Sequence, residues 1–301
     1  MTGAQVPEGA DCVIVVEETV SERKEYIRYV GGKSPGNICF QGEDIRRGDV
    51  LLRKGTRVRA QEIAVLASAG YGTVAAFCQP LVGIASTGNE LYPPGQKVPP
   101  GSIRDSNSYQ LYAQVVSLGL SGLNHGIVRD TPEDIQAALQ ALEQKADVIL
   151  ITGGVSAGDY DFVPEELDKA GYTNVFYRVA IKPGMPLWFG TKEGKYCFGL
   201  PGNPVSTFVQ FEYVIKPFLY KIMGSDYIPR LVKLPMGEEY RSKKSERDSI
   251  IPVKIKEGKV HPVEYHGSAH ISAIPRADGF IMVSGNQEIL NTGDLIDVRL
   301  L

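Results

Sequence analysis

Small residues followed by acids form the most distinctive segment of this sequence. The run TGGVSAGDYD at 152–161 joins four small residues to two carboxylates two positions apart: Gly153, Gly154, Ser156, Gly158, Asp159 and Asp161. Glycines let backbone N–H groups approach an anion, and a pair of carboxylates suits Mg²⁺. An ordinary strand-to-helix turn with solvated aspartates is the alternative, although such a turn does not need this many small residues beside two acids. The segment predicts an anion- and Mg²⁺-binding loop.

A second rigid turn follows the apolar run at 196–200. Its four turn residues are Pro201, Gly202, Asn203 and Pro204, and Pro204 has the backbone angle of a first helical residue. Such a loop at a helix N-terminus is suited to a flat heterocycle or a phosphate. Taken alone, the segment is explained equally well as a turn capped by asparagine.

Two more polar segments follow apolar runs or open helices. STGNEL contributes Thr87, Gly88 and Glu90, and RDSNSYQL contributes Ser106 and Asn107. Helix capping explains each of them as well as ligand binding does. They gain weight as candidates only together with the other loops.

Three charged residues complete the set of candidates. Asp130 precedes a helix start that Thr131 and Pro132 already explain, so its carboxylate is available for a site. Arg178 and Lys182 lie in FYRVAIKPGMP and are suited to an oxyanion. A bland surface position is the alternative for each of the three.

The elements that would position these residues alternate in type. Strand-like and helical apolar runs follow one another at 81–85, 108–118, 125–128, 132–145, 147–151, 164–169, 196–200 and 205–223. This order predicts an α/β fold with a doubly wound, mostly parallel sheet. Ligands bind beyond the carboxyl ends of such strands, so we expect the strand-end loops to face one cleft with acidic and basic walls.

The flanks of this sheet are expected to be rich in β-structure. On the N-terminal side, short strands are predicted at 12–16 and 26–30, a helix at 61–68 and an extended run at 73–77. On the C-terminal side, strands are predicted at 250–255, 259–265, 279–283 and 295–300, with a hairpin turn at Glu257 and Gly258. We therefore expect four parts: a partial β-rich domain at 1–58, a helical linker at 59–79, the α/β domain at 80–228, and a small β-barrel-like domain at 229–301.

Composition narrows the class of protein. The 301 residues carry a formal net charge of -3 without a block of like charges, so we expect neither a nucleic-acid nor a membrane partner. The 4 cysteines are scattered without a CxxC pair, which argues against a disulfide framework and a zinc knuckle and favours the cytoplasm. No apolar run reaches the about 18 residues of a membrane span.

Seven segments in fixed order resemble one family. They are TGAQVPEGAD, PGNICFQGEDIRRGDVLLRKGT, STGNEL, RDSNSYQL, TGGVSAGDYD, AIKPGMP and GLPGNPVS. In this order they are similar to segments of molybdopterin molybdenumtransferases and of the matching domain of gephyrin. The resemblance covers essentially the whole chain. It implies that 80–224 binds adenylylated molybdopterin, and that 2–50 reaches the partner subunit's site in a homodimer.

The resemblance also implies site residues. Those with site roles by matching motifs are Glu90, Asp130, Asp161, Lys182, Pro201 and Pro204. Arg178 stands where the family often has lysine, Thr2 falls at the threonine of the family's TGA motif, and Arg247 with Ser268 or Ser272 is a weaker candidate for molybdate.

Two departures from the family pattern stand out. The chain begins at the TGA motif, so the family's N-terminal part, with further active-site and dimer residues, is expected to be missing. Cys39, Phe40 and Gln41 occupy a place where the family commonly has arginine.

The function implied is insertion of molybdate into adenylylated molybdopterin with release of AMP, the last step of molybdenum cofactor biosynthesis. Mg²⁺ on Asp159 and Asp161 would neutralise the phosphates, while Lys182 and Arg178 draw in molybdate. Two alternatives stay open: a molybdopterin adenylyltransferase that uses ATP, and a non-catalytic dimeric module that binds the cofactor or acts as a scaffold.

Overall fold

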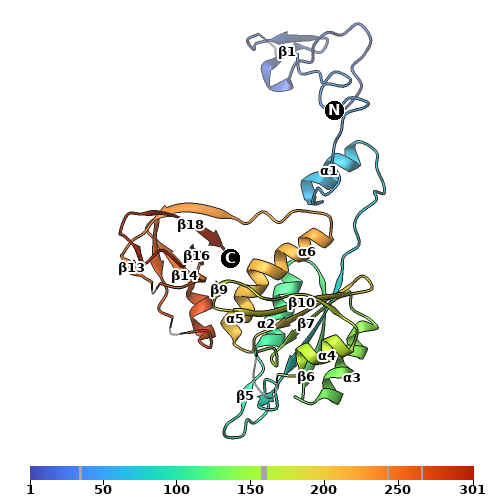
Figure 1. The fold of residues 1–301 in the computed structure, drawn as a ribbon. Helices are drawn as coiled ribbons and strands as arrows, with labels where there is room; N and C mark the ends of the chain where they lie inside the picture. Colours follow the sequence, from blue (N-terminus) through green and yellow to red (C-terminus); the bar gives the residue numbers. More distant parts are fainter. Residues whose placement is uncertain (34–35, 157–160, 243, 266) are drawn as a thin grey trace. The chain divides into compact units, whose positions relative to one another are not determined.

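The chain divides into two compact units. In the computed structural model, which describes residues 1–301 except 34–35, 157–160, 243 and 266, one unit is Met1–Val74 and the other is Ala75–Leu301. Figure 1 draws both, and each is described by itself below. The expected four-part division at residues 58, 79 and 228 stays a prediction.

The N-terminal unit, Met1–Val74, holds one hairpin and one helix. Strands β1 (Thr19–Arg23) and β2 (Tyr26–Tyr29) pair antiparallel after a 3-10 turn at Val16–Glu18. The predicted strand at 12–16 is wrong, because residues 12–15 join no ladder and are held instead by bonds such as that from Val13 N–H to the Gly36 carbonyl. The predicted helix at 61–68 is confirmed as α1 (Ala60–Ser68).

A six-stranded sheet organises the C-terminal unit, Ala75–Leu301. Its order is β6-β3-β7-β11-β10-β8, and its strands are β3 (Leu81–Thr87), β6 (Ser121–Val128), β7 (Val148–Thr152), β8 (Thr173–Arg178), β10 (Pro186–Lys192) and β11 (Lys195–Leu200). The first four in this order are parallel, while β10 pairs antiparallel with both β11 and β8. The prediction of a mostly parallel sheet is confirmed, although β8 and β10 were not predicted. The expected extended run at 73–77 joins no ladder.

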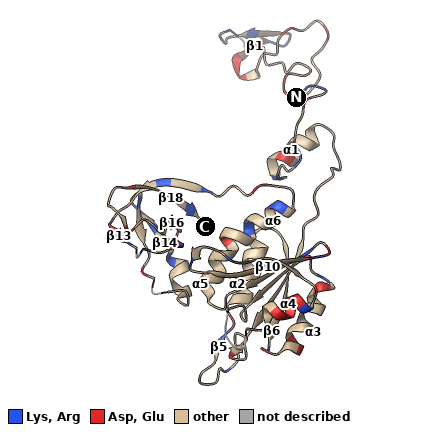
Figure 2. Ribbon diagram, in the orientation of Figure 1, with Lys and Arg blue, Asp and Glu red and all other residues tan. Residues whose placement is uncertain are grey.

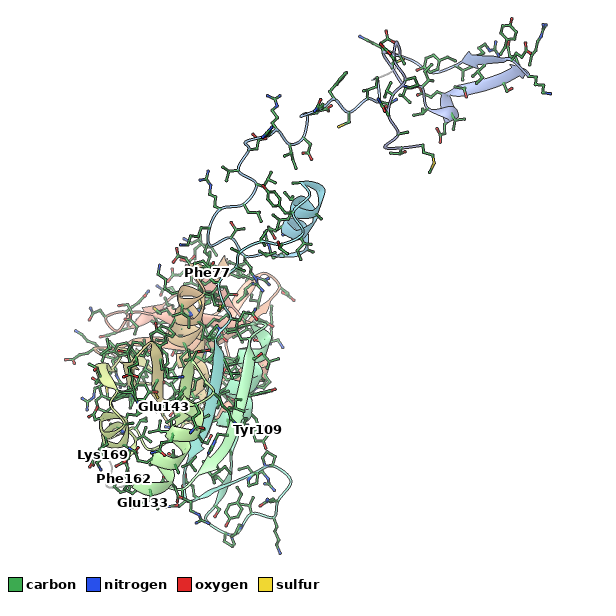
Figure 3. All side chains as sticks on the ribbon, turned by 90° about the vertical axis from the view of Figure 1, so that its right-hand side faces the viewer. Phe77, Tyr109, Glu133, Glu143, Phe162 and Lys169 are labelled. Carbon is green, nitrogen blue, oxygen red and sulfur yellow. The ribbon has the colours of Figure 1, made fainter. Side chains whose placement is uncertain are left out.

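Helices cover both faces of this sheet, as expected for a doubly wound fold. On one face α3 (Pro132–Glu143) and α4 (Val163–Lys169) bury Leu139 and Leu167 against Ile149. Figure 3 faces this layer and labels Glu133 and Glu143 on α3 and Lys169 at the end of α4. Thr131 caps α3 by accepting a hydrogen bond from the Asp134 N–H at 3.2 Å, which confirms the expected helix start.

The other face carries α2 (Asn107–Ser117) and a long helical segment. This segment was predicted as one helix at 205–223, and it consists of α5 (Pro204–Gln210), a π turn at Phe211–Ile215 and α6 (Lys216–Ile222) in direct succession. Leu111 of α2 and Phe211 of the π turn pack in one cluster with Ile84 of β3.

A second sheet follows after Pro229. Its order is β12-β18-β16-β14-β15, with β12 (Leu231–Pro235), β14 (Asp248–Lys256), β15 (Lys259–Pro262), β16 (Gly279–Val283) and β18 (Leu295–Leu300), and a small ladder joins β13 (Tyr240–Arg241) to β17 (Ile289–Leu290). A bridge between Met236 and Val260 brings the two edges together, consistent with the barrel-like shape expected. Glu257 and Gly258 form the predicted hairpin turn, with φ of 51° and 72°.

One short strand near the first sheet pairs with the second sheet. Strand β9 (Ile181–Lys182) pairs parallel with β14, so that Lys182 lies opposite Ser249. Figure 2 shows lysine and arginine interspersed with acids over the described chain. In the part of the chain that the structure describes, no helix has the length and apolar character to cross a bilayer.

Candidate functional site

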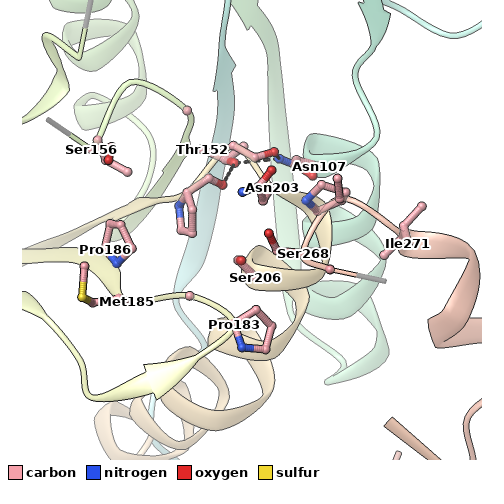
Figure 4. A pocket seen from close by; sticks show the side chains of 18 of the residues that line it. Asn107, Thr152, Ser156, Pro183, Met185, Pro186, Asn203, Ser206, Ser268 and Ile271 are labelled. Atoms are coloured by element: carbon pink, nitrogen blue, oxygen red, sulfur yellow. Dashed lines mark hydrogen bonds between the residues drawn. The ribbon is translucent and has the colours of Figure 1, made fainter. Parts of the chain in front are cut away.

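A large cavity opens at the carboxyl ends of β3, β7 and β11. Its volume is about 1340 Å³, and Figure 4 shows side chains from several elements pointing into it. The opposite wall comes from β14 and from the loop after β15. Its lining residues include Arg247, Ile250 and Ser268. Doubly wound sheets bind ligands in this position because strand ends and helix N-termini converge there.

Hydrogen bonds lock three of the loops to one another. The Asn107 amide donates to Thr152 Oγ1 at 2.9 Å and to the Gly202 carbonyl at 2.8 Å. Thr152 Oγ1 donates to the Pro201 carbonyl at 2.8 Å, and Thr207 Oγ1 donates to the same carbonyl at 2.6 Å. The start of α2, the end of β7 and the turn before α5 therefore form one rigid cavity floor (Figure 4).

Asn107 leaves one strong acceptor without a partner in this floor. The Gly202 carbonyl can only accept, so the amide nitrogen must face it and Oδ1 must point the other way. Asn107 is 8% exposed, and its Oδ1 has no hydrogen-bond partner. A buried orphan acceptor costs about 1–3 kcal/mol, which a ligand N–H would recover. The Asn107 side chain is thus prepared for a donor that enters the cavity.

Glycine is required where the loop after β7 passes under β3. Gly153 and Gly154 have φ of 96° and 62°. A Cβ on Gly153 would lie 2.4 Å from the Thr87 carbonyl oxygen, and one on Gly88 would lie 2.9 Å from Glu90 Oε1. These glycines let the two loops and the Glu90 carboxylate come close together.

The N-terminus of helix α2 is capped by the buried carboxylate of Asp105 and not by Ser106, the residue at the N-cap position. Asp105 is 3% exposed and accepts hydrogen bonds from the Ser108 N–H at 3.1 Å and from Ser86 Oγ at 3.0 Å. Ser106 makes no side-chain cap and lines the cavity instead. The hydroxyl that a simple capping interpretation would use up is therefore turned toward the site.

Three acids lie along one side of the cavity. Asp130 Oδ2 accepts a hydrogen bond from the Asn89 N–H at 3.0 Å. Burial raises the pKa of the Asp130 carboxyl above its ordinary value, and the charges of Glu90 and Asp161 act in the same direction. The described residues contain no cluster of three or more histidine, cysteine, aspartate or glutamate side chains that could hold a metal ion. The acids are thus near enough to repel one another, but they are not a preformed metal cage.

Basic side chains line the cavity as well, among them Arg104 near the start of α2. Lys182, Arg241 and Arg247 line the cavity, and the pairing of β9 with β14 fixes the backbone of Lys182. The carbonyl of Ser268 accepts a hydrogen bond from the Val205 N–H at 3.0 Å, which holds its loop at the start of α5. These cations are suited to an oxyanion.

Most residues singled out from the sequence line this one cavity. Those that line the cavity are Thr87, Gly88, Glu90, Ser106, Asn107, Asp130, Gly153, Gly154, Ser156, Asp161, Lys182, Pro201, Gly202, Asn203, Pro204, Arg247 and Ser268. Asp161, Lys182 and Asn203, which the expected shared cleft required on one side of the molecule, are therefore brought together.

The remaining candidates lie elsewhere. Arg178 is exposed at the end of β8, with its guanidinium 5.7 Å from the Tyr177 ring centroid, and Ser272 is exposed on a 3-10 helix at Ile271–Arg276; neither lines the cavity. Thr2 belongs to the N-terminal unit, and its place in a site stays a prediction. Gly158 and Asp159 fall outside the described residues.

Sequence reasoning missed several residues of the site. Thr152 and Thr207 supply the hydroxyls of the cavity floor. Tyr240 and Arg241 come from β13, and Tyr265 comes from the loop after β15. Thr152 carried a usable signal, because a polar residue ends an otherwise apolar five-residue strand. The second-sheet residues carried none, since their place depends on a long-range pairing.

Three family models match successive parts of the chain. The model described as "MoeA N-terminal region (domain I and II)" matches residues 1–70, "Probable molybdopterin binding domain" matches 83–221, and "MoeA C-terminal region (domain IV)" matches 233–301. They follow the same order as the sequence segments and the structural elements.

Named relatives and solved structures agree with these models. The molybdopterin molybdenumtransferase of Staphylococcus epidermidis is 34% identical over 306 residues, covering 100% of this chain and 73% of that protein. The enzyme of the same name from Staphylococcus aureus is 33% identical, with the same coverage. A molybdopterin biosynthesis MoeA protein from Pyrococcus horikoshii superimposes with a TM-score of 0.79 at 30% identity, covering 99% of this chain and 74% of that one. The chain belongs to the molybdopterin molybdenumtransferase family.

Proposed function

We propose that this chain inserts molybdate into adenylylated molybdopterin and releases AMP. The observation that carries the proposal is a single cavity lined by both acids and cations, with a floor of interlocked loops. Such a cavity can hold a phosphate-bearing heterocycle and an oxyanion at the same time, which the reaction requires. The relatives that match are named for this transfer.

The floor would bind the organic substrate. Backbone N–H groups of the loop after β7 and the N-terminus of α5 are suited to its phosphates. The orphan Oδ1 of Asn107 would accept a hydrogen bond from an N–H of one of its rings. Because the loops are already held by hydrogen bonds, little ordering remains for binding, so the chain mainly supplies orientation.

The acidic side fits a Mg²⁺ ion that is completed by the substrate. Mg²⁺ sites often use one or two carboxylates together with substrate phosphates. Asp130, Glu90 and Asp161 repel one another in the free protein, so a cation among them would relieve the repulsion. Bound there, Mg²⁺ would neutralise phosphate charge, and Asp159 stays a predicted ligand beside Asp161.

The basic side chains would bind molybdate. Lys182 and Arg247 supply positive charge, and the Ser268 hydroxyl lies on the same wall. Holding the oxyanion there would bring it to the substrate's two sulfur atoms, which would displace molybdate oxygens as water or hydroxide. Water would add to phosphorus as the phosphoanhydride bond breaks, and AMP would leave. In this scheme the protein forms no covalent bond and stabilises charge instead.

The assembly and compartment are part of the proposal. A homodimer, in which Thr2 and the rest of 2–50 reach the partner subunit's cavity, accords with the family resemblance. The cytoplasm accords with cysteines that are all unbridged in the structure.

AMP release from adenylylated molybdopterin, measured with and without molybdate, tests the function. We expect release to depend on molybdate and to be lost without Mg²⁺. Equal release without any oxyanion would refute the coupling. ATP consumption with free molybdopterin would indicate an adenylyltransferase instead, and binding without turnover would indicate a scaffold.

Two variants test where the oxyanion binds. Lys182→Ala removes a cavity cation, and we expect about 10- to 100-fold lower kcat/KM for molybdate from the loss of charge-assisted hydrogen bonds. Arg178→Ala is the matched control, because Arg178 lies outside the cavity wall; we expect a change of less than about 2-fold. A loss in Arg178→Ala as large as in Lys182→Ala would contradict this assignment.

A further inference from the structure

Tyr177 connects the edge of the first sheet to the cavity loop. It lies on β8 and packs on the α3–α4 face, in the cluster that contains Val155 and Val163. Its hydroxyl lies 2.7 Å from the Val155 carbonyl oxygen and 2.6 Å from the Ser156 carbonyl oxygen. A hydroxyl has one proton, so it donates to one of these carbonyls at a time or is shared between them.

The loop after β7 is held at two levels. Its first residues are fixed by backbone bonds, from the Gly153 N–H to the Leu200 carbonyl at 2.9 Å and from the Val163 N–H to the Gly154 carbonyl at 3.1 Å. Beyond Gly154, among the described residues, the Tyr177 hydroxyl donates to the backbone carbonyls of Val155 and Ser156.

The surroundings of Tyr177 keep it a hydrogen-bond donor. Burial raises the pKa of Tyr177 above its ordinary value; the charge of Arg178 opposes this shift, and that of Asp161 adds to it. The phenol therefore remains protonated at neutral pH. The influence of Asp161 also shows that the hydroxyl is electrostatically close to an acid of the cavity wall.

We propose that Tyr177 is a positioning residue for the substrate. By holding the carbonyls of Val155 and Ser156 it presets these two residues, both of which line the cavity. Preorganisation of this kind lowers the cost of binding without changing the reacting groups. The inference rests on the proposed function, because the loop is assigned there to the adenylylated substrate and Mg²⁺.

Tyr177→Phe tests the inference by removing the hydroxyl and keeping the ring. We expect KM for adenylylated molybdopterin, and the Mg²⁺ concentration for half-maximal rate, to rise about 3- to 10-fold, the range of one hydrogen bond. We expect kcat at saturating substrate and Mg²⁺ to stay within about 2-fold, because bound ligand holds the loop in place.

The matched control is Tyr196→Phe. Tyr196 lies near the start of β11, at the other end of that strand from Pro201, and its ring meets Phe218 edge to face with centroids 4.9 Å apart. The control removes a phenol oxygen from the same sheet away from the cavity. We expect no change in KM or in the Mg²⁺ requirement.

Hydrogen exchange of the free 301-residue chain gives a readout that does not depend on activity. In Tyr177→Phe we expect faster exchange in a peptide covering 153–156, with the other sheet strands unchanged. Unchanged exchange in this peptide, faster exchange throughout the sheet, or a KM shift no larger than in Tyr196→Phe would each overturn the inference. A wild-type chain without turnover would refute the proposed function, while exchange would still show whether Tyr177 holds the loop.

Discussion

The carbonyl of Pro201 offers a sharp test of how the cavity floor is held. It is buried and accepts hydrogen bonds from two hydroxyls, Thr152 Oγ1 at 2.8 Å and Thr207 Oγ1 at 2.6 Å. Thr152→Val and Thr207→Val each remove one hydroxyl and keep the branched shape of the side chain. Either change alone leaves the carbonyl with one donor. The double variant leaves a buried carbonyl with none of these donors.

The expected magnitudes follow from counting the bonds. Thr152→Val loses two bonds, one from Asn107 and one to Pro201, and should cost about 1–3 kcal/mol of unfolding free energy. Thr207→Val loses its bond to Pro201 and should cost about 0.5–1.5 kcal/mol. The double variant also leaves the Pro201 carbonyl without either hydroxyl donor. Its loss of unfolding free energy should therefore exceed the sum of the two single-variant losses by about 1–2 kcal/mol.

Urea unfolding followed by tryptophan fluorescence measures this coupling. The chain has 1 tryptophan. It is Trp188, 2% exposed on β10 of the same sheet, so the signal reports the unfolding of this layer. Additive costs, within about 0.5 kcal/mol, would refute the shared-acceptor argument. A coupling of the opposite sign would mean that the loops repack when the hydroxyls are lost.

Two further predictions concern the floor and the acidic side. Gly153→Ala should lower the free energy of unfolding by more than about 2 kcal/mol, because its Cβ would lie 2.4 Å from the Thr87 carbonyl oxygen and φ is 96°. In the control Gly202→Ala the nearest atom to the Cβ is 3.9 Å away, and the loss should stay below about 1 kcal/mol. Equal losses of melting temperature in the two variants would contradict this. Asp130→Asn should raise the melting temperature at pH 7, since burial raises the pKa of Asp130 in the folded chain, and the stability that protonation provides is lost as pH rises through that value. The gain should shrink as pH falls below the carboxyl's pKa, and a variant less stable than wild type at pH 7 would contradict it.

The loops of the cavity were predictable because strand direction decides where they lie. Apolar runs alternating with helical ones imply parallel strands, and parallel strands place their carboxyl ends at one edge. The loops after β3, β7 and β11, and with them Gly153, Asn203 and Glu90, were therefore expected together, and the structure places them so. No knowledge of individual contacts was needed for this step.

The sheet edge was harder to predict because its strands break the alternation. β8 and β10 follow α4 without a helix between them and pair antiparallel, so the rule for strand ends does not apply to them. Arg178 closes β8 and faces solvent, while its neighbour Tyr177 turns inward to the loop. Adjacent residues on a strand point to opposite sides, so a shift of one position separates a surface cation from a residue that contacts the site.

The basic wall depends on a contact that no local pattern encodes. Lys182 sits in the two-residue strand β9, and its backbone is held by parallel pairing with Ser249 of β14, 67 residues further along the chain. Such a pairing gains little by itself, and it forms only because both sheets are already folded. The acidic loops thus belong to the first sheet alone, whereas Lys182 and Arg247 reach the cavity through the joining of the two sheets. Any change that separates β9 from β14 should therefore weaken oxyanion binding while the floor around Asn107 and Thr152 stays intact.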